Sequence, residues 1–351
     1  IEPLGLLWSM KPTSEEASPK PEKDIVQWSA HEVSGEPSGV ATEIASATTE
    51  IFRQVGDLEE SALSKDEELQ GAFVLRGKGD EKLPVIILLG GSEGGDWSAR
   101  ASAPGLASRG FAAVGVPYYS PAYNDAKPQF DRLPTAFINI PVDRLEAVRD
   151  AIEARVDLDA DRIGIIGVSK GAEFALLAGS HFDWISAVCA IVPSDVVWEG
   201  WGDSHSGPRS CFSLNGKPLP FVPYEGMQTA IDKLRAGEPT TIREPHDAGR
   251  IKYAERVPDA RIRVEEIRSA VMLVGGDQDE TWNSGEMSRN IVETRLEAGL
   301  KTEAWISPLA GHYLSGHAFR PLKAAEGSLR SRTYPAMLDF FQRNLRSASN
   351  D

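Results

Sequence analysis

Ser169 lies between two glycines at the point where an apolar run gives way to a helix-forming run. The residues Gly167, Ser169 and Gly171 have the spacing G-x-S-x-G. Small residues on both sides let a strand and a helix approach closely, and the serine hydroxyl then projects from a strained turn, clear of both elements. A hydroxyl presented in this way can attack an acyl carbonyl once a neighbouring base removes its proton. The spacing therefore predicts nucleophilic catalysis at Ser169.

The same spacing occurs a second time, around Ser92. That serine follows the apolar run 85–89, but two glycines and an aspartate come next, at 94–96, and favour an open loop over a helix. Ser169 is instead followed by residues 172–178, which are good helix formers with a broad apolar face. We therefore predict that Ser169 is the nucleophile and that Ser92 belongs to a loop.

A nucleophilic serine needs a general base, and the base needs an acid that orients it. In the α/β-hydrolase order the acid and then a histidine follow the serine, each on a loop after a later strand. The apolar run 270–276 is typical of a buried strand and is followed by the acidic residues of 277–280, so we expect the acid there. A further strand is expected at 302–306, and Gly311 gives His312 a tight turn after it. His312 is the predicted base.

The other five histidines have alternative interpretations. His317 is the competing base, but no strand directly precedes it. The remaining four are expected to be solvated loop residues, namely His31, His181, His205 and His246.

The elements that must position these residues alternate between strand and helix. Strands are predicted at 71–76, 85–90, 111–117, 162–167, 185–192, 270–275 and 302–306, with helices between them that include 142–154 and 288–298. This alternation predicts an α/β fold of the α/β-hydrolase type, with a doubly wound and mostly parallel sheet. We expect a hydrolase core at 68–192 and 265–351, a cap insertion at 193–264, and an N-terminal arm or extra strands at 1–67.

Five ordered segments resemble one known family. They are residues 89–95, 108–119, 167–171, 276–284 and 310–313. Together, over about residues 68 to 345, they look like the C-terminal hydrolase domain shared by acyl-CoA thioesterases and bile acid-CoA:amino acid N-acyltransferases, and more distantly like dienelactone hydrolases. The resemblance implies Ser169 as nucleophile, His312 as base and Asp279 as acid, because Asp279 stands three residues before Trp282 as the family's acid does. Asp277 is the alternative acid.

The resemblance also bears on the reaction. The acyltransferases of this family use cysteine as nucleophile, whereas this chain has Ser169, so hydrolysis is favoured over amide transfer. Animal members carry a β-sandwich domain ahead of the hydrolase, but the roughly 70 residues available here are short for one, and 11–23 are polar and rich in proline. This departure weakens any inference about the substrate from the animal enzymes.

We therefore predict a serine hydrolase of esters or acyl thioesters that works through an acyl-enzyme. The alternatives are a carboxylesterase or dienelactone-type hydrolase of small esters without CoA, an acyltransferase, and a catalytically silent binding protein with the same fold. The oxyanion would be held by main-chain N–H groups, that of Lys170 and one from the loop that contains Ser92 and Glu93. Five aromatic residues of the insertion either line an acyl pocket or anchor the insertion to the sheet: Trp198, Trp201, Phe212, Phe221 and Tyr224.

Composition limits the partners. The net charge of −15 disfavours nucleic acid, and no run approaches the roughly 18 apolar residues that span a bilayer, so a soluble chain with a small-molecule substrate is expected. No cysteine and histidine spacing is typical of a metal site, and serine chemistry needs no cofactor. Cys189 is expected to be a buried free thiol, with a disulfide to Cys211 as the alternative. The compartment stays open, with the cytoplasm slightly favoured over export, and so does the oligomeric state.

Overall fold

The computed structural model describes residues 24–33, 41–51, 57–122, 127–202, 207–314 and 329–346. The chain divides into two units, Ile1–Asp57 and Leu58–Asp351. The first contains β1 (Asp24–Val33) and β2 (Ala41–Ile51), which pair in antiparallel fashion. His31 therefore lies in a strand, not in the predicted loop. His205 and His317 fall outside the described residues.

The second unit is built on an eight-stranded sheet, in the order β13-β12-β9-β8-β5-β6-β4-β3. From β13 to β6 each neighbouring pair is parallel, whereas β4 runs antiparallel to both β6 and β3. The strands are β3 (Leu58–Ala62), β4 (Phe73–Gly77), β5 (Leu83–Leu89), β6 (Ala112–Gly115), β8 (Leu158–Val168), β9 (Ile185–Ile191), β12 (Ala270–Gly276) and β13 (Glu303–Ser307). The predicted mostly parallel sheet is confirmed. Strand β3, from the segment 1–67 that was expected to form an arm or extra strands, is the edge strand of this sheet.

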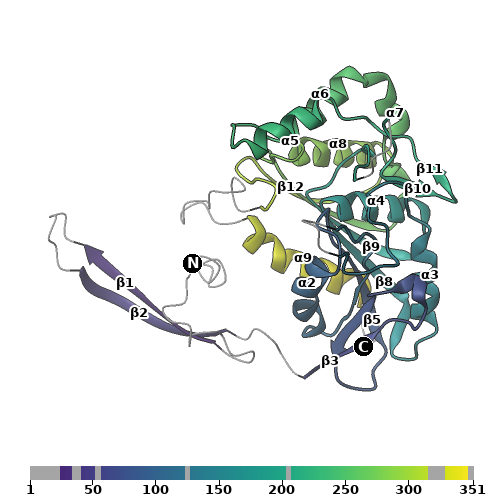
Figure 1. Cartoon of the computed structure of the whole chain (residues 1–351). Helices are drawn as coiled ribbons and strands as arrows, with labels where there is room; N and C mark the ends of the chain where they lie inside the picture. Colours follow the sequence, from purple (N-terminus) through teal and green to yellow (C-terminus); the bar gives the residue numbers. More distant parts are fainter. Residues whose placement is uncertain are drawn as a thin grey trace. The chain divides into compact units, whose positions relative to one another are not determined.

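Helices cover both faces of this sheet, as Figure 1 shows. They are α2 (Trp97–Ala107), α3 (Arg144–Glu153), α4 (Lys170–His181), α8 (Ser284–Glu297) and α9 (Leu329–Leu345), with the short 3-10 turns η2 (Glu67–Leu69) and η4 (Val264–Glu266). The apolar strand β5 alternates between the two faces. Val85 and Ile87 pack in the cluster that contains residues of α3 and α4, whereas Ile86 and Leu88 pack with α2 and α9. A strand buried on both sides explains the unbroken apolar run in the sequence.

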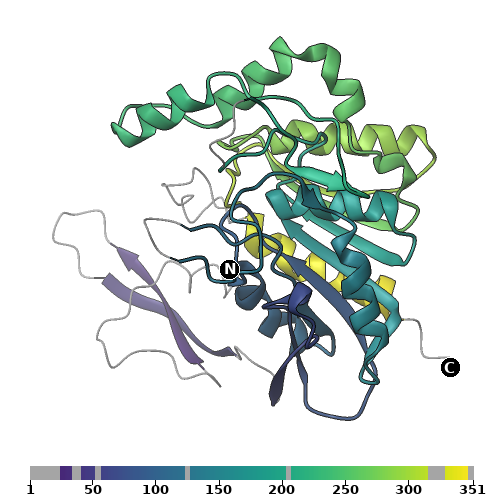
Figure 2. The same ribbon diagram turned by 45° about the vertical axis from the view of Figure 1, so that its right-hand side comes forward.

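The insertion between β9 and β12 has regular structure that was not predicted from the sequence. It contains β10 (Phe212–Leu214), β11 (Lys217–Pro218), α5 (Met227–Arg235), α6 (Arg243–Lys252), η3 (Ala254–Arg256) and α7 (Val257–Ala260). Strand β10 pairs with β11 and with β7 (Ile140–Pro141) of the core. The three helices lie together at one end of the unit (Figure 2). In α5, Met227, Ala230, Ile231 and Leu234 have the spacing of an apolar helix face, but the glycine and proline content of 193–264 led to the expectation of an irregular insertion.

Two further expectations concern the whole unit. Cys189 and Cys211 are both buried free thiols, so the predicted thiol is confirmed and the alternative disulfide is absent. Within the described ranges, no helix combines the length and the apolar character needed to cross a bilayer.

Candidate active site

Ser169 stands between the last residue of β8 and the first residue of α4. Its backbone has φ 56° and ψ −119°, in the positive-φ region that residues with a side chain rarely adopt. The surrounding structure holds this conformation, since the Ser169 N–H donates to the carbonyl of Ile191 at 2.9 Å. The strained corner of the predicted nucleophile elbow is therefore present.

The two flanking glycines leave no space for a side chain. A Cβ on Gly167 would lie 1.8 Å from the carbonyl oxygen of Gly171. A Cβ on Gly171 would lie 2.3 Å from the carbonyl oxygen of Gly90, in the loop after β5. Both atoms belong to the backbone and cannot swing away, so glycine is required at each position. The G-x-S-x-G spacing thus reflects a three-way contact of β8, α4 and the β5 loop.

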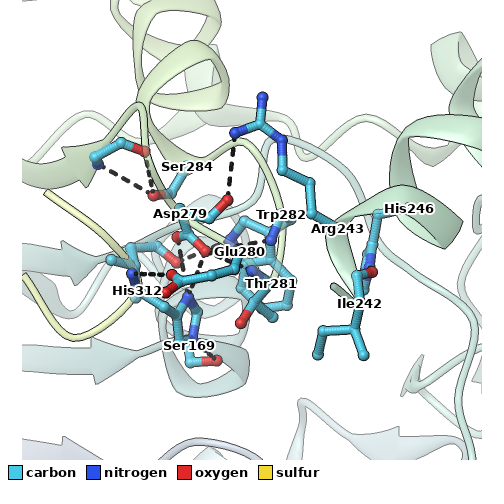
Figure 3. Close-up of polar contacts among 12 residues, drawn as sticks. Ser169, Ile242, Arg243, His246, Asp279, Glu280, Thr281, Trp282, Ser284 and His312 are labelled. Atoms are coloured by element: carbon cyan, nitrogen blue, oxygen red, sulfur yellow. Dashed lines mark hydrogen bonds and ion pairs between the residues drawn. The ribbon is translucent and has the colours of Figure 1, made fainter. Parts of the chain in front are cut away.

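Ser169, His312 and Asp279 form one hydrogen-bonded chain (Figure 3). The Ser169 Oγ lies 3.0 Å from His312 Nε2, and His312 Nδ1 lies 2.9 Å from each carboxylate oxygen of Asp279. This geometry fits an Nδ1–H that donates to the carboxylate and an Nε2 that accepts from the hydroxyl. Ser169 is 8% exposed and Asp279 is fully buried, whereas the His312 side chain retains 13% exposure. The hydroxyl and imidazole can therefore meet a substrate while the acid stays shielded from water.

Asp279 is held by more than the imidazole. Its Oδ1 accepts hydrogen bonds from the backbone N–H groups of Thr281, at 2.9 Å, and Trp282, at 3.3 Å. A buried carboxylate needs such partners, because an unpaired buried charge is costly. The alternative acid, Asp277, faces elsewhere and forms a two-pronged ion pair with the exposed Arg289 at 2.8 and 2.9 Å. Of the two candidates, only Asp279 contacts His312.

The three residues meet because each follows the carboxyl end of a parallel strand. Ser169 follows β8, Asp279 follows β12 and His312 follows β13. The carboxyl ends of parallel strands lie at one edge of the sheet, where α/β proteins place their ligand sites. The strand order β13-β12-β9-β8 brings the three loops together across that edge.

The structure adds two residues that the sequence did not indicate. Glu280 accepts a hydrogen bond from the backbone N–H of His312 at 3.1 Å. Arg243, on α6 of the insertion, donates from Nη1 to the carbonyl oxygens of Asp277, at 2.9 Å, and Asp279, at 3.3 Å. Arg243 also donates its backbone N–H to the Glu280 carbonyl at 2.9 Å. The insertion therefore braces the loop that carries the acid, through contacts that no sequence spacing signals.

The predicted oxyanion donors lie beside the nucleophile. Lys170 is the first residue of α4, so its backbone N–H belongs to the first turn, where helix donors have no intrahelical acceptor. A Cβ on Gly91 would lie 3.2 Å from the Ser169 Cβ, so the loop that contains Ser92 passes directly next to the serine. The Glu93 carboxylate accepts the Gly91 N–H at 2.9 Å and a hydrogen bond from the Ser98 hydroxyl, which shapes this loop. The donor role of these N–H groups remains a prediction.

The five aromatic residues of the insertion fall into two groups. Trp198 and Phe212 are fully buried in hydrophobic clusters, as the anchoring alternative expects. Trp201, Phe221 and Tyr224 are half-buried. For these three a place in an acyl pocket remains a prediction.

A surface cavity of about 580 Å³ lies apart from these residues. It is next to β3 and β4, with Glu60 and Arg132 among the residues that line it. None of the predicted site residues lines it, so we do not connect it with the chemistry at Ser169.

His246 is not the solvated loop residue that the sequence suggested. It lies on α6, is 3% exposed, and packs against the rings of Trp198 and Tyr224, each with a centroid distance of 4.7 Å, and of Trp282 at 5.5 Å. Its Nδ1 lies 2.6 Å from the Ile242 carbonyl, whereas Nε2 has no hydrogen-bond partner among the described residues. Burial lowers the pKa of His246 to about 3, so the imidazole is neutral.

The fold and this arrangement define an α/β hydrolase. The sequence profile described as "BAAT / Acyl-CoA thioester hydrolase C terminal" matches residues 150–327, about half of the chain. The chain belongs to this family, and the resemblance seen in its motifs is confirmed.

Individual relatives agree with this membership. An acyl-coenzyme A amino acid N-acyltransferase 2 of Rattus norvegicus is 36% identical over 254 residues, which cover 71% of this chain and 53% of that protein. Acyl-coenzyme A thioesterase 1 of Rattus norvegicus is 27% identical over 244 residues, which cover 69% of this chain and 51% of that protein. The chain thus spans about half the length of the curated relatives it matches.

Solved structures share the fold. A protein from Klebsiella pneumoniae subsp. pneumoniae assigned as a dienelactone hydrolase has a TM-score of 0.51 and 16% identity, over 82% of this chain and 98% of that chain. Dipeptidyl peptidase 4 of Porphyromonas gingivalis has a TM-score of 0.52 and 17% identity, over 83% of this chain and 36% of that chain. Likeness at these identities establishes the fold alone.

The buried imidazole of His246 predicts acid sensitivity. Above pH 6.5 the folded and unfolded states both hold it neutral; between pH 6.5 and about 3 only the unfolded state takes up a proton. The free energy of unfolding should therefore decrease as the pH is lowered through this window. This group contributes at most about 1.4 kcal/mol per pH unit to the decrease. The substitution His246→Asn keeps an N–H near the Ile242 carbonyl but does not titrate. Urea unfolding at pH 7, 6, 5 and 4 should show a shallower decline in the variant, and an equal decline would contradict the assignment.

The acid can be tested within one loop. We expect Asp279→Asn to lower kcat by about 10⁴-fold, because an amide would favour the wrong imidazole tautomer. The matched change Asp277→Asn should cost far less, since Asp277 faces Arg289. Steady-state kinetics measure kcat of both variants. A larger loss of kcat in Asp277→Asn than in Asp279→Asn would assign the acid role to Asp277.

Proposed function

We propose that this chain is a serine hydrolase that cleaves acyl thioesters or carboxylic esters through an acyl-enzyme. The observation that carries the proposal is the hydrogen-bonded chain from Asp279 through His312 to the Ser169 hydroxyl. The acid is buried, the base is partly exposed and the nucleophile stands on a strained corner. This is the constellation that acyl transfer to serine requires.

In the acylation step, Ser169 Oγ attacks the acyl carbonyl carbon while His312 Nε2 takes the hydroxyl proton. Asp279 keeps Nδ1 protonated and stabilises the imidazolium that forms, while itself remaining ionised. When the tetrahedral intermediate collapses, the bond to the leaving sulfur or oxygen breaks and Nε2 returns the proton to it. A water molecule, deprotonated by the same nitrogen, then releases the acid and restores Ser169.

Negative charge on the former carbonyl oxygen would be met by main-chain donors. The candidates are the N–H of Lys170, at the positive end of α4, and an N–H from the loop of Ser92 and Glu93. Because this loop passes directly next to Ser169, it is the expected source of the second donor.

The family and the names of its members favour an acyl-CoA thioester as the substrate. The relatives that match most of the core include acyl-coenzyme A thioesterases and one acyl-coenzyme A amino acid N-acyltransferase. The net charge of −15 works against a polyanionic CoA moiety and keeps small carboxylic esters as the second candidate. Serine at position 169, where the resemblance places cysteine in the acyltransferases, favours water as the acyl acceptor.

Removing the nucleophile is the direct test. We expect the purified chain to hydrolyse acyl-CoA thioesters and short p-nitrophenyl esters, and Ser169→Ala to lower kcat on either by about 10⁶-fold. Thiol release and p-nitrophenol absorbance measure the two reactions. Hydrolysis of the p-nitrophenyl esters without hydrolysis of the acyl-CoA thioesters would favour the carboxylesterase hypothesis.

The second G-x-S-x-G serine provides the matched control. Ser92→Ala should retain most of the activity, because any contribution of residue 92 to catalysis comes from its main chain. Comparable activity in Ser169→Ala and the parent chain would overturn the proposal.

The half-buried Trp201 tests the acyl pocket. Its ring stacks on Phe137 with a centroid distance of 4.6 Å, and the residue is half-buried. If it faces the acyl chain, Trp201→Ala should change the relative kcat/KM between short and long acyl groups by about tenfold or more. Kinetics across an acyl series, alongside thermal unfolding, measure the effect. A uniform loss with a large fall in Tm would instead identify Trp201 as an anchor.

A further inference from the structure

Lys170 and Glu173 form an ion pair inside the protein, one helical turn after the nucleophile. The Lys170 Nζ lies 2.8 Å from Glu173 Oε2, and the two side chains are 2% and 0% exposed. The proposed mechanism uses only the main chain of Lys170. Replacement of such a pair by apolar groups of similar volume is often neutral or stabilising, so stability alone does not account for it.

The second carboxylate oxygen of Glu173 binds the insertion. Its Oε1 accepts the backbone N–H of Trp198 at 3.1 Å and the thiol of Cys211, also at 3.1 Å. These two residues are themselves joined, because the Cys211 N–H donates to the Trp198 carbonyl at 3.1 Å. Glu173 therefore ties two separate segments of the insertion to the helix that carries Ser169.

The ammonium of Lys170 lies near three aromatic rings, one of them in the same segment as Trp198 and two in other segments. It lies 5.9 Å from the ring centroid of Phe137 and 5.6 Å from those of Trp201 and Trp282. A cation over an aromatic face is attracted by the ring, most strongly where water is excluded. Burial by itself lowers the pKa of Lys170, but its contacts with Cys211 and Glu173 outweigh burial, and the pKa is raised.

One of these rings connects the ammonium to the base. Trp282 lies three residues after Asp279 and packs edge-on against the His312 imidazole, with a centroid distance of 5.4 Å. Trp282 also donates its backbone N–H to the Asp279 carboxylate. A shift of Trp282 would therefore move both the base and the acid relative to Ser169.

We propose that the Lys170–Glu173 pair is a positioning device. It fixes the loop that carries Asp279, and the insertion, in their places relative to Ser169. This inference rests on the proposed function, because it concerns how Ser169 and His312 are aligned. Lys170 acts through Trp282 and Trp201, and Glu173 acts through Trp198 and Cys211. Neither side chain contacts the reacting atoms, so both are positioning residues.

The test removes the charge of Lys170 alone and then the charges of both Lys170 and Glu173. It separates an effect on the alignment of the catalytic groups, measured by kcat, from an effect on the stability of the fold, measured by Tm. Lys170→Met alone leaves a buried carboxylate without its cation, so we expect a lower Tm and a kcat reduced by about 100-fold, as small misplacements of catalytic groups can cause. The double variant Lys170→Met/Glu173→Gln removes both charges and keeps an amide oxygen for the Trp198 N–H. We expect it to regain most of the Tm while kcat stays low and KM changes little. Recovery of kcat together with Tm would overturn the inference.

A buried cation elsewhere in the unit is the matched control. Arg295, on α8, is 1% exposed and donates to the carbonyl oxygens of Val264 and Ile267 at 2.8 and 2.7 Å. Arg295→Met should lower Tm without lowering kcat per folded molecule. If Lys170→Met does not fold, Lys170→Arg serves instead, since it keeps the charge but displaces it. An unchanged kcat in that variant would contradict the inference.

Labelling of the serine distinguishes this inference from the proposed function. A fluorophosphonate probe reacts with an activated serine whatever the natural substrate, and Ser169→Ala gives the background. Absence of labelling at Ser169 in the parent chain would overturn the proposed function itself. Labelling of the parent, with an equal rate in the double variant, would overturn only the positioning role of Lys170 and Glu173.

Discussion

The close approach of β8, α4 and the loop after β5 is the contact on which the rest of the site depends. At Gly167 and Gly171 an added Cβ would fall within 2.3 Å of a backbone oxygen. The two elements can therefore meet only through glycine, and Ser169 between them is forced to φ 56°. That strain is maintained by the packed sheet on either side, and it presents the hydroxyl to His312.

The remaining groups of the site are held by contacts with the insertion and by contacts between the loops at the sheet edge. Arg243 donates hydrogen bonds to main-chain carbonyls of the loop that carries Asp279, and Glu280 accepts the main-chain N–H of His312. Inside the protein, the Lys170–Glu173 pair joins the nucleophile helix to the insertion. Each buried charge is paired or hydrogen-bonded, as burial demands. The insertion thus contacts the loop of Asp279 and the helix after Ser169 through its hydrogen bonds.

Features that depend on neighbouring residues could be predicted from the sequence, and features that depend on distant segments could not. The strands, their parallel order and the elbow at Ser169 follow from apolar runs and glycine spacing, which act over a few residues. The helices α5 and α6 were missed because the glycines and prolines of 193–264 outweighed the helical spacing of Ala230, Ile231 and Leu234 in the prediction. His246 was expected in a solvated loop, but three rings from different segments surround it. Burial of a single polar residue depends on which segments pack together, and a sequence does not display that.

The sequence by itself predicted the fold class and a candidate site of serine, acid and histidine in that order, because glycine sterics and the periodicity of apolar residues act over a few neighbouring positions. Tertiary structure decided which of two carboxylates in one loop faces the imidazole. Asp277 and Asp279 have the same chemistry and lie two residues apart, yet one pairs with Arg289 and the other with His312. It also decided that Lys170 and Glu173 face the insertion. Both outcomes depend on distances between segments far apart in the chain, which exist only once the loops at the sheet edge have packed.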